Sequence, residues 1–259
     1  RCLVGSEMCI RDRNYSVNNI LCISDLHLDS VDSPLTEALF NLLLEHKNVP
    51  TDLYLLGDLF EIWIGDDHET DLANAVAEHL SDFAKDHNNI FFIHGNRDFL
   101  VGDAFAQRGN FKLCSDPTYI TFGDMKIALS HGDFLCTSDV DYINFRNSVR
   151  TSKWQVNFLQ KSLGERKTIA SEMRQQSKVS SFQKDSMITD VNVDAVLDFL
   201  SVERPDIFVH GHTHRPKIHQ HKLNDQTCDR YVLGDWGNTG WYFKIDKNGP
   251  ELIQFNISS

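Results

Sequence analysis

Five short segments of this chain combine Asp, Asn, His and Gly in patterns that can bind metal ions. Each one follows an apolar run that predicts a β-strand. The segments are Asp25-Leu26-His27, Gly57-Asp58, Gly95-Asn96-Arg97-Asp98, His131-Gly132-Asp133 and His210-Gly211-His212-Thr213-His214. Such residues, placed in loops at the carboxyl ends of strands, predict a two-metal hydrolase that acts on a phosphate ester or anhydride.

The spacing of the Asp and His residues suits chelation. Asp25 and His27 are two positions apart, as are His212 and His214, so on an extended strand end each pair points the same way. Asp58 comes directly after a glycine and can reach inward, which makes it the candidate carboxylate between two ions. Two ions about 3.5–4 Å apart can activate water and clamp a phosphate.

Two further residues widen the choice of ligand atoms. Asn96 offers a neutral oxygen and His131 an imidazole. Mixed imidazole and carboxylate ligands favour Mn, Fe or Zn over Mg or Ca. A lone Gly-Asp or His-Gly-Asp is more often a turn, but His210, His212 and His214 are costly to bury without a partner. Because all five segments follow strands in order, we favour the metal site.

The first part of the chain alternates predicted strands and helices. Apolar runs at 20–23, 52–56 and 90–93 predict buried strands, and helical spacing marks 35–44 and 71–86. Strand, helix, strand, helix, strand is the pattern of an α/β sheet with right-handed crossovers. Later strands are predicted at 119–122, 125–130, 207–209, 230–233, 241–245 and 252–255. We expect these to form a second, more antiparallel sheet that faces the first.

Residues 142–184 do not fit either sheet. The segment is helical in pattern and holds nine Lys or Arg residues against two Glu, with five aromatic residues interleaved. These aromatic residues are Tyr142, Phe145, Trp154, Phe158 and Phe182. One interpretation is a solvated helical insertion with a small core of its own. The other is a cap beside the active site, whose cations meet an anionic substrate and whose apolar residues meet an apolar group.

Composition limits the classes of protein. A chain of 259 residues with 41% hydrophobic residues suits one large domain, or one domain with an inserted subdomain. A formal charge of -12 argues against general nucleic-acid binding, which needs a basic face. No apolar run approaches the ~18 residues of a membrane span.

The six cysteines bear on the redox environment of the protein, and the first residues bear on where the native chain starts. No two cysteines form a Cys-x-x-Cys pair, so we expect a reduced, cytoplasmic protein with plain thiols. Residues 8–13 resemble the end of a translated sequencing adapter, and residues 1–13 lack the order and length of a signal peptide. We therefore expect them to be non-native, with the true start near Asn14 or lost.

The five segments together resemble the signature of the calcineurin-like metallophosphoesterases. That signature is Asp-x-His, Gly-Asp, Gly-Asn-(His/Arg)-(Asp/Glu), an isolated His, and Gly-His-x-His. The longer strings at 23–28, 57–67, 94–100 and 211–216 resemble a branch of the family that hydrolyses UDP-2,3-diacylglucosamine in lipid A synthesis. The resemblance runs from about residue 20 into the C-terminal region, including 233–236.

This resemblance implies a fold and a metal centre. The fold is an α/β/β/α sandwich of two mixed sheets over 14–259, with a helical lid inserted at 135–190. The centre holds two Mn²⁺ ions. One ion would be bound by Asp25, His27, Asp58 and His214, and the other by Asp58, Asn96, His131 and His212.

The resemblance also implies a reaction. Water attacks the α-phosphorus of the UDP-linked lipid, giving UMP and 2,3-diacylglucosamine 1-phosphate. Asn96, Arg97 and His212 would take part in catalysis and also contact substrate. Further substrate contacts in the lid would come from Asp139, Ser177, Ser181 and Lys184. The chain departs from the family at Ser138 and Ser181, where relatives show Asp and Asn, which weakens the assignment of single contacts but not of the reaction.

Arg97 is the most discriminating position. Many relatives have His there as a general acid, whereas a pyrophosphate leaving group needs less protonation and a permanent cation can serve. The alternative is a surface Arg paired with Asp98. Among the other polar residues, we expect His94, His219 and His221 to be structural and Glu61, Asp66 and Asp67 to shape a loop. Trp63 could pack in the core or lie at the rim of the site, and the sequence does not distinguish these positions.

The resulting expectation is a cytoplasmic enzyme bound peripherally to the inner membrane of a Gram-negative-type bacterium. Its partner would be a lipid-linked UDP-sugar substrate, with no nucleic acid and no obligate protein partner. One alternative is a phosphodiesterase or nucleotide pyrophosphatase of the same family with a soluble substrate. The other is a scaffold that keeps the fold without the metals, although all seven candidate ligand residues are present.

Overall fold

The structure is a computed structural model that describes residues 19–85, 87–183, 188–224 and 226–257. The side chains of 178–183 are not among the described parts. The expectation about residues 1–13 therefore lies outside the described residues. The same holds for Cys2, Cys9 and Lys184.

The first sheet has six strands in the order β11-β10-β1-β2-β3-β4. Four of them run parallel: β1 (Asn19–Ile23), β2 (Thr51–Leu55), β3 (Asn89–Ile93) and β4 (Lys112–Cys114). Two antiparallel strands, β10 (Thr239–Asp246) and β11 (Gly249–Asn256), complete the sheet beside β1. The parallel arrangement turns the carboxyl ends of β1, β2 and β3 toward one edge.

The second sheet has five strands in the order β5-β6-β7-β9-β8. They are β5 (Thr118–Phe122), β6 (Met125–Ser130), β7 (Ile207–His210), β8 (Lys217–Leu223) and β9 (Gln226–Val232). The strands β6, β7 and β9 are parallel neighbours, and β5 and β8 pair antiparallel at the two edges. This sheet is therefore mixed as well.

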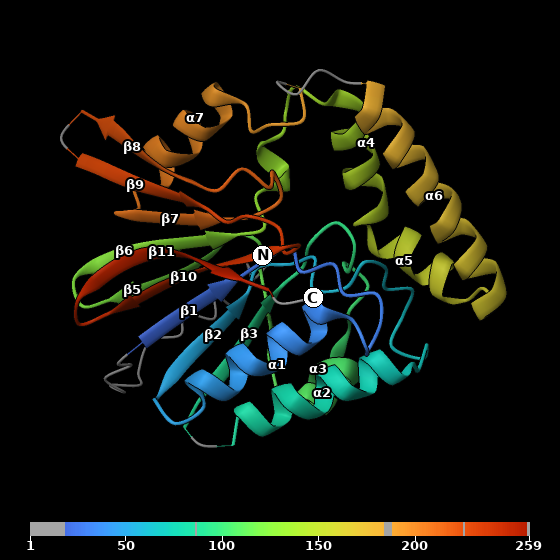
Figure 1. Cartoon of the computed structure of the whole chain (residues 1–259). Coiled ribbons are helices and arrows are strands. Elements are labelled where there is room, and N and C mark those ends of the chain that lie inside the picture. The colour runs from blue at the N-terminus through green and yellow to red at the C-terminus, as the bar shows by residue number, and fades with distance from the viewer. Residues whose placement is uncertain (1–18, 86, 184–187, 225, 258–259) are drawn as a thin grey trace, which may run out of the picture.

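Side chains alternate between the two faces of each strand, and this builds the layers. On β1, Ile20 and Cys22 lie in the apolar core between the sheets. Leu21 and Ile23 point the other way, into the core that the first sheet shares with its covering helices. These helices are α1 (Pro34–His46), α2 (Asp71–Phe83) and α3 (Asp103–Gly109), and α7 (Val193–Glu203) covers the second sheet. Figure 1 shows this helix–sheet–sheet–helix order, which confirms the expected α/β/β/α sandwich.

Three more helices stand beside the sandwich, on the right in Figure 1. They are α4 (Val140–Val149), α5 (Ser152–Leu159) and α6 (Leu163–Gln183), which follow the short helix η1 (Asp133–Leu135) after β6. Asp139 and Thr151 cap α4 and α5 by accepting from backbone N–H groups in the first turn. We call α4–α6 the insertion. Among the described helices, none is both long and apolar enough to cross a bilayer.

The late strands are where the sequence prediction was wrong. We expected 241–245 and 252–255 to belong to the second sheet, but β10 and β11 extend the first sheet. The reason is that Phe243 and Ile245 face the core between the sheets, and an apolar pattern marks a buried face without naming the neighbouring strand. The helix predicted at 71–86 ends at Phe83.

Candidate metal centre and adjoining pocket

All five predicted segments lie at the carboxyl ends of strands and meet at one edge of the sandwich. Asp25 and His27 follow β1, Asp58 follows β2, and Asn96 follows β3. From the second sheet, His131 follows β6, and the segment with His212 and His214 follows β7. Parallel strands in both sheets thus deliver ligand-type residues from distant parts of the sequence to the same place.

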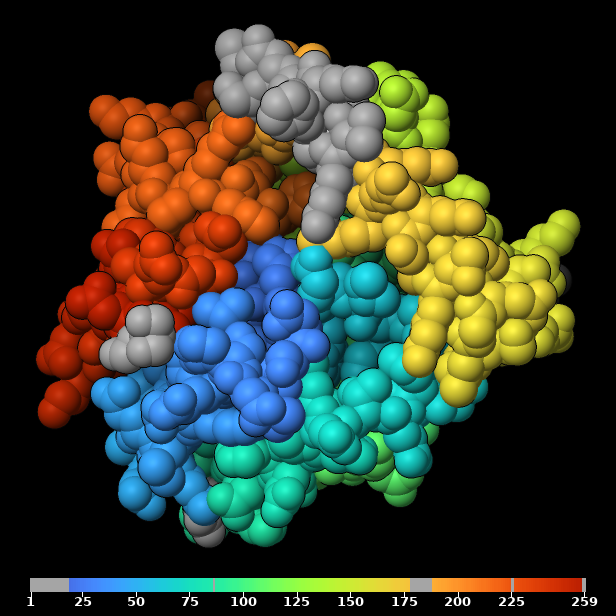
Figure 2. Space-filling view, turned by 45° about the vertical axis from the view of Figure 1, so that its right-hand side comes forward, coloured from blue at the N-terminus to red at the C-terminus, as the bar shows by residue number. Residues whose placement is uncertain are grey.

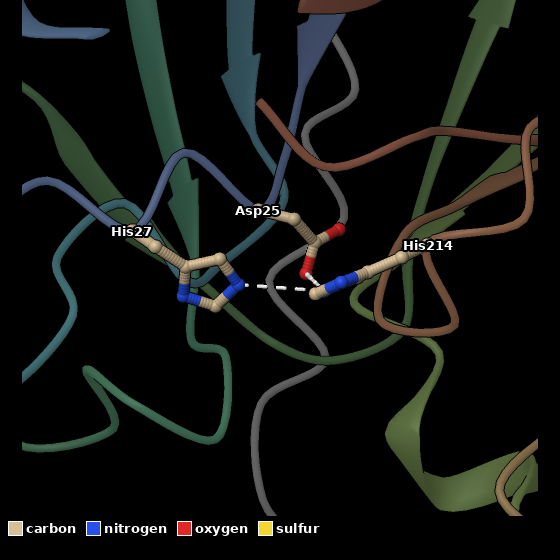
Figure 3. A group of neighbouring side chains, drawn as sticks. All are labelled: Asp25, His27 and His214. Atoms are coloured by element: carbon tan, nitrogen blue, oxygen red, sulfur yellow. Dashed lines mark hydrogen bonds and ion pairs between the residues drawn. The ribbon is translucent and has the colours of Figure 1, made fainter. Parts of the chain in front are cut away.

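Asp25, His27 and His214 form one group (Figure 3). The Nε2 atoms of His27 and His214 are 3.3 Å apart, and Nε2 of His214 is 3.3 Å from Oδ1 of Asp25. The other oxygen of Asp25 accepts hydrogen bonds from Ser24 Oγ and from the His212 backbone N–H. Oδ1 is buried and has no hydrogen-bond partner among the described residues. A buried carboxylate oxygen that faces two imidazoles suits a cation.

Asp58, Asn96 and His131 form the adjoining group. Nε2 of His131 lies 3.0 Å from Oδ1 of Asn96 and 3.8 Å from Oδ1 of Asp58. The other oxygen of Asp58, Oδ2, lies 4.0 Å from Nε2 of His27. Asp58 thus approaches His27 of the first group as well as His131. Asp25 is the carboxylate with atoms close to both Asp58–His131 and His27–His214, so the bridging role expected for Asp58 stays a prediction.

The three histidines share one orientation. Each turns Nε2 toward the carboxylates and Nδ1 toward an outer acceptor: Leu56 O for His131 at 2.9 Å, Asp235 for His214 at 3.5 Å, and Glu61 for His27 at 3.4 Å. The contact of His131 is a hydrogen bond, whereas Nδ1 of His27 is buried, makes no hydrogen bond among the described residues and has Glu61 as its ion-pair neighbour. In metal-binding histidines generally, an outer acceptor holds the proton on Nδ1 and leaves the Nε2 lone pair free. Neither outer carboxylate was predicted from sequence, because both contacts depend on how distant loops meet.

The backbone around these residues is unusual. Asp25, His27, Asp58, His212 and His214 all have positive φ angles, between 51° and 69°. Few non-glycine residues adopt this conformation, and it tends to persist where the surrounding structure enforces it at functional sites. Asp25 and His27, and likewise His212 and His214, therefore lie in turns with left-handed backbone conformations. We had expected extended strand ends at these positions.

The pKa values show how strongly negative the centre is. Burial opposes protonation of His131, but the carboxylates of Asp58 and Asp25 outweigh it and raise the pKa of this histidine. Burial likewise opposes charge on His214, yet contacts with Asp235 and Asp25 raise its pKa to about 10. The carboxylates therefore retain protons on nearby imidazoles. A divalent cation could replace these protons, so the residues fit a metal site.

His212 has a different position from the other six predicted ligands. Its ring lies 5.0 Å from that of His131 and is stacked on Tyr142 of α4 at 5.6 Å. It belongs to neither of the two groups whose His and carboxylate atoms lie within 4.8 Å of one another among the described residues. Burial and the charge of His131 lower the pKa of His212 to about 4, so its ring is neutral at pH 7 and can act as a ligand or acceptor.

Arg97 lies beside this centre and does not pair with its neighbour Asp98. Its Nε is 4.0 Å from Oδ2 of Asp58. Asp98 is fully buried and accepts hydrogen bonds from the backbone N–H groups of Leu59 and Gly95. The alternative of a surface Arg97–Asp98 pair is therefore wrong.

A pocket of about 310 Å³ opens next to Arg97, between the core and the insertion. From the core it is lined by Trp63, Asn96, Arg97, Phe99 and Leu100, and from the insertion by Tyr142, Phe145, Trp154, Phe158, Ala170 and Met173, among others. Trp63 is both core and rim, because it is 7% exposed and also lines the pocket. The lining is thus mixed: Asn96 and Arg97 connect the pocket to the metal centre, and aromatic side chains contribute from both the core and the insertion.

The structure places the predicted insertion contacts unevenly. Asp139 and Ser177 line the pocket. Ser138 accepts a hydrogen bond from Asn192. Ser181 falls in the part of α6 whose side chains are not described, and Lys184 lies outside the described residues. The contacts of these last two remain predictions.

Two ion pairs fasten α6 to the loop after β2. Arg166 is only 2% exposed, bonds both oxygens of Asp67 and donates to Ile64 O at 2.7 Å. Arg174 pairs with Glu61. In Figure 2, α6 (yellow) lies against the cyan residues of this loop. Glu61 and Asp67 therefore hold the insertion to this loop, and their expected role in shaping the loop itself stays a prediction.

Asp133 connects the insertion to the segment that carries His131. Its Oδ2 accepts from Tyr142 Oη at 2.7 Å and from Arg146 Nε at 2.8 Å, and Arg150 lies 3.4 Å away. Burial disfavours the carboxylate, but His131 and the two arginines outweigh it and hold the pKa of Asp133 below its usual range. This contact fixes α4 over the centre.

The remaining predicted polar residues have structural partners. His94 bonds Val101 O at 2.7 Å, and Asp66 accepts from the backbone N–H groups of Gly102 and Phe105 at the start of α3. His221 accepts from Arg230, which also contacts the buried His210. The ring of His219 lies beside that of His221, 6.3 Å between centroids. The four cysteines among the described residues are unpaired thiols.

The chain is similar to known proteins over most of its length. The model of the calcineurin-like phosphoesterase family matches residues 19–216. A protein of Aromatoleum aromaticum named UDP-2,3-diacylglucosamine hydrolase is 43% identical over 90% of this chain and 95% of its own. A protein of the same name from Cellvibrio japonicus is 40% identical over 92% of this chain and 100% of its own. A solved structure described as a novel archaeal phosphodiesterase aligns with 92% of this chain and 99% of its own at 13% identity, with a TM-score of 0.46.

Proposed function

Because the chain belongs to the calcineurin-like phosphoesterase family, we propose that it hydrolyses the pyrophosphate bond of UDP-2,3-diacylglucosamine. The products are UMP and 2,3-diacylglucosamine 1-phosphate, and the reaction serves lipid A synthesis. The names of relatives that are 43% and 40% identical over nearly the whole chain support this substrate.

One structural observation carries the proposal: the metal centre and the aromatic pocket share Asn96 and Arg97. A substrate with an anionic pyrophosphate and two acyl chains needs both environments side by side. Arg97 and the centre meet the pyrophosphate, while the aromatic side chains of the insertion meet apolar groups. The insertion is the lid of this site.

The metal centre would hold two divalent ions, which we assign as Mn²⁺. Asp25, His27, Asp58 and His214 would hold the first ion, and Asp58, Asn96, His131 and His212 would hold the second. Imidazole, carboxylate and amide ligands suit Mn, Fe or Zn better than Mg. When bound, the two ions activate a water molecule and offset charge on the phosphate oxygens.

The chain's own residues orient the substrate for attack at the α-phosphorus. Water adds to this phosphorus, and the bond to the bridging oxygen breaks, so that the leaving group departs as the sugar 1-phosphate. Arg97 is a permanent cation beside Asp58 and offsets charge on the pyrophosphate oxygens. Asn96 and His212 hold the phosphate. Asp139, Ser177, Ser181 and Lys184 contact the rest of the substrate from the insertion.

The enzyme works on the cytoplasmic side of the inner membrane and binds there peripherally. The insertion presents exposed apolar side chains at Val156, Leu159 and Leu163, which are 54%, 41% and 37% exposed. Lys153 and Lys161 are exposed on the same segment, and such cations attract anionic headgroups. Flotation with phosphatidylglycerol vesicles tests this. Binding to these vesicles but not to phosphatidylcholine vesicles is expected, and no flotation with either contradicts it.

The function is tested by incubating the purified protein with Mn²⁺ and UDP-2,3-diacylglucosamine. We expect release of UMP that stops when EDTA removes the metal and returns when Mn²⁺ is restored. Absence of UMP, together with rapid hydrolysis of ADP-ribose, would favour the soluble-substrate alternative. A soluble substrate has no acyl chains, so that alternative does not explain the aromatic lining of the pocket.

A further inference from the structure

Glu61 contacts the metal centre with one oxygen and the insertion with the other. Its Oε2 lies 3.4 Å from Nδ1 of His27, and its Oε1 pairs with Arg174 on α6. The three side chains are 25%, 17% and 18% exposed. A single carboxylate thus joins a candidate metal ligand to the helix that covers the pocket.

The other two histidines of the centre are held differently. His131 is held by Leu56 O, the backbone of the residue that follows β2, and His214 by Asp235, which follows the end of β9. Among the described residues, neither of these acceptors makes a hydrogen bond or ion pair with the insertion. Among the three described outer acceptors, Glu61 is therefore the one whose position depends on α6.

We propose that Glu61 is a positioning residue that couples closure of the insertion to metal binding at His27. The inference rests on the proposed function, since it takes the centre to hold metal. Docked Arg174 holds the Glu61 carboxylate 3.4 Å from Nδ1 of His27, a buried atom that makes no hydrogen bond among the described residues. A small shift of Glu61 toward His27 on metal binding turns this contact into a hydrogen bond. That contact keeps the proton on Nδ1 and orients Nε2 toward the ion.

The coupling must act in both directions. If docking of α6 strengthens metal binding, metal binding strengthens docking of α6 by the same factor. The metal would then help to close the pocket, where Arg174 and Glu61 both form part of the lining. Substrate would meet a closed aromatic pocket only in enzyme that already holds metal.

The second ion pair between α6 and the same loop provides a matched control. Arg166 and Asp67 also join the insertion to the loop after β2, but Asp67 contacts none of the candidate ligands among the described residues. Asp67→Asn therefore loosens the insertion without touching His27. Glu61→Gln and Arg174→Met break the first pair and leave the second intact.

Titration calorimetry with Mn²⁺ on the intact chain measures the first half of the coupling. We expect Glu61→Gln to weaken Mn²⁺ binding by about tenfold or more, as is common for outer acceptors of metal-bound histidines. Arg174→Met should weaken it by about three- to tenfold, although Arg174 is not a ligand. In protein that already carries Glu61→Gln, Arg174→Met should weaken Mn²⁺ binding by less than about a further twofold. The contact through which Arg174 acts on His27 is then already lost. Asp67→Asn should leave the affinity within about twofold.

Hydrogen exchange of the backbone amides in 163–177 measures the second half. Mn²⁺ should slow this exchange in the unchanged protein and in Asp67→Asn, but not in Glu61→Gln. Unchanged Mn²⁺ affinity in Arg174→Met, or an equal loss in Asp67→Asn, overturns the inference.

If Arg174→Met does not fold, Arg174→Lys replaces it, with a smaller loss of Mn²⁺ affinity expected. Failure of the proposed function is a separate result: the protein binds Mn²⁺ and shows the coupling but releases no UMP.

Discussion

The Nε atom of Arg97 lies 4.0 Å from Oδ2 of Asp58, and among the described residues it has no hydrogen-bond partner although it is buried. A permanent cation with an unused donor thus stands beside the Asp58 carboxylate. Its backbone N–H donates to the other oxygen of the same Asp58 at 2.7 Å. The backbone contact fixes the loop and leaves the guanidinium available for an anionic substrate.

Arg97→Ala should lower kcat by about 10²–10³, because it removes a charged donor aimed at charge that grows in the transition state. Arg97→Lys should recover part of this loss, since it keeps the charge but not the planar fork. Steady-state kinetics with UDP-2,3-diacylglucosamine measures both. Mn²⁺ binding should stay within about threefold, and a parallel loss of metal and activity would show that Arg97 acts by holding Asp58.

Gly95 keeps space for Asp58. A Cβ at Gly95 would lie 2.1 Å from Oδ1 and 2.3 Å from the backbone N of Asp58, so Gly95→Ala must displace the Asp58 carboxylate. We expect kcat to fall by about 10² or more, as small misplacements at reacting centres do, with loss of bound Mn²⁺ measured by elemental analysis.

Gly164→Ala is the matched control, because a Cβ there meets nothing within 4 Å. It should keep both Mn²⁺ and activity. Full activity in Gly95→Ala would contradict the assigned role of Asp58.

The sequence was sufficient to predict that the seven candidate ligands lie at one edge of the sandwich. Each of them follows a strand whose direction the α/β pattern predicts. It could not predict the positive φ angles at Asp25, His27 and Asp58, which arise where several loops constrain one another. Nor could it predict that Glu61 and Asp235 stand behind His27 and His214. Such contacts depend on loop geometry, which no periodicity encodes.

Three of the elements missed in the sequence leave a weak apolar pattern, each for a different physical reason. The edge strand β8 is largely polar, with a burial pattern in which no residue is fully buried, so its pairing with β9 leaves little apolar signal. Helix α3 has only seven residues, too few for a periodic pattern. Helix α7 buries Val196 and Leu200 but exposes Val193 and Val202, which blurs its amphipathic stripe.

Ala170→Phe tests whether the aromatic pocket binds the acyl chains. Ala170 lines the pocket from α6, and a larger side chain would fill space that the lipid needs. We expect the KM for UDP-2,3-diacylglucosamine to rise by about tenfold or more, equivalent to about 1.4 kcal/mol of binding. Hydrolysis of a small chromogenic phosphodiester should stay within about twofold.

Val202→Phe provides the comparison for this variant, since Val202 is exposed on α7, outside the insertion, and is not among the residues that line the pocket. It should leave both activities unchanged. An equal loss of both activities in Ala170→Phe would show that the pocket supports the fold and not the lipid.

Asp133→Asn should lower the free energy of unfolding by about 3–5 kcal/mol, because it leaves Arg146 and Arg150 facing a neutral group in a buried site. The folded-state pKa of Asp133 is depressed, so its contribution is complete above the unfolded value of about 4 and is lost as pH falls through the folded value. The difference between the variant and the unchanged protein should therefore be constant near pH 7 and shrink in acid.

Urea unfolding at a series of pH values measures this difference. Asp124→Asn, in the exposed turn between β5 and β6, should change the stability by less than about 0.5 kcal/mol. A cost for Asp133→Asn that does not shrink below pH 4 would assign its effect to shape and not to charge.

The most direct test of the central claim is hydrolysis of UDP-2,3-diacylglucosamine in ¹⁸O-labelled water with Mn²⁺, followed by mass spectrometry of both products. Attack at the α-phosphorus places one labelled oxygen in UMP and none in 2,3-diacylglucosamine 1-phosphate. Label in the sugar phosphate, or no turnover of this substrate, would contradict the account.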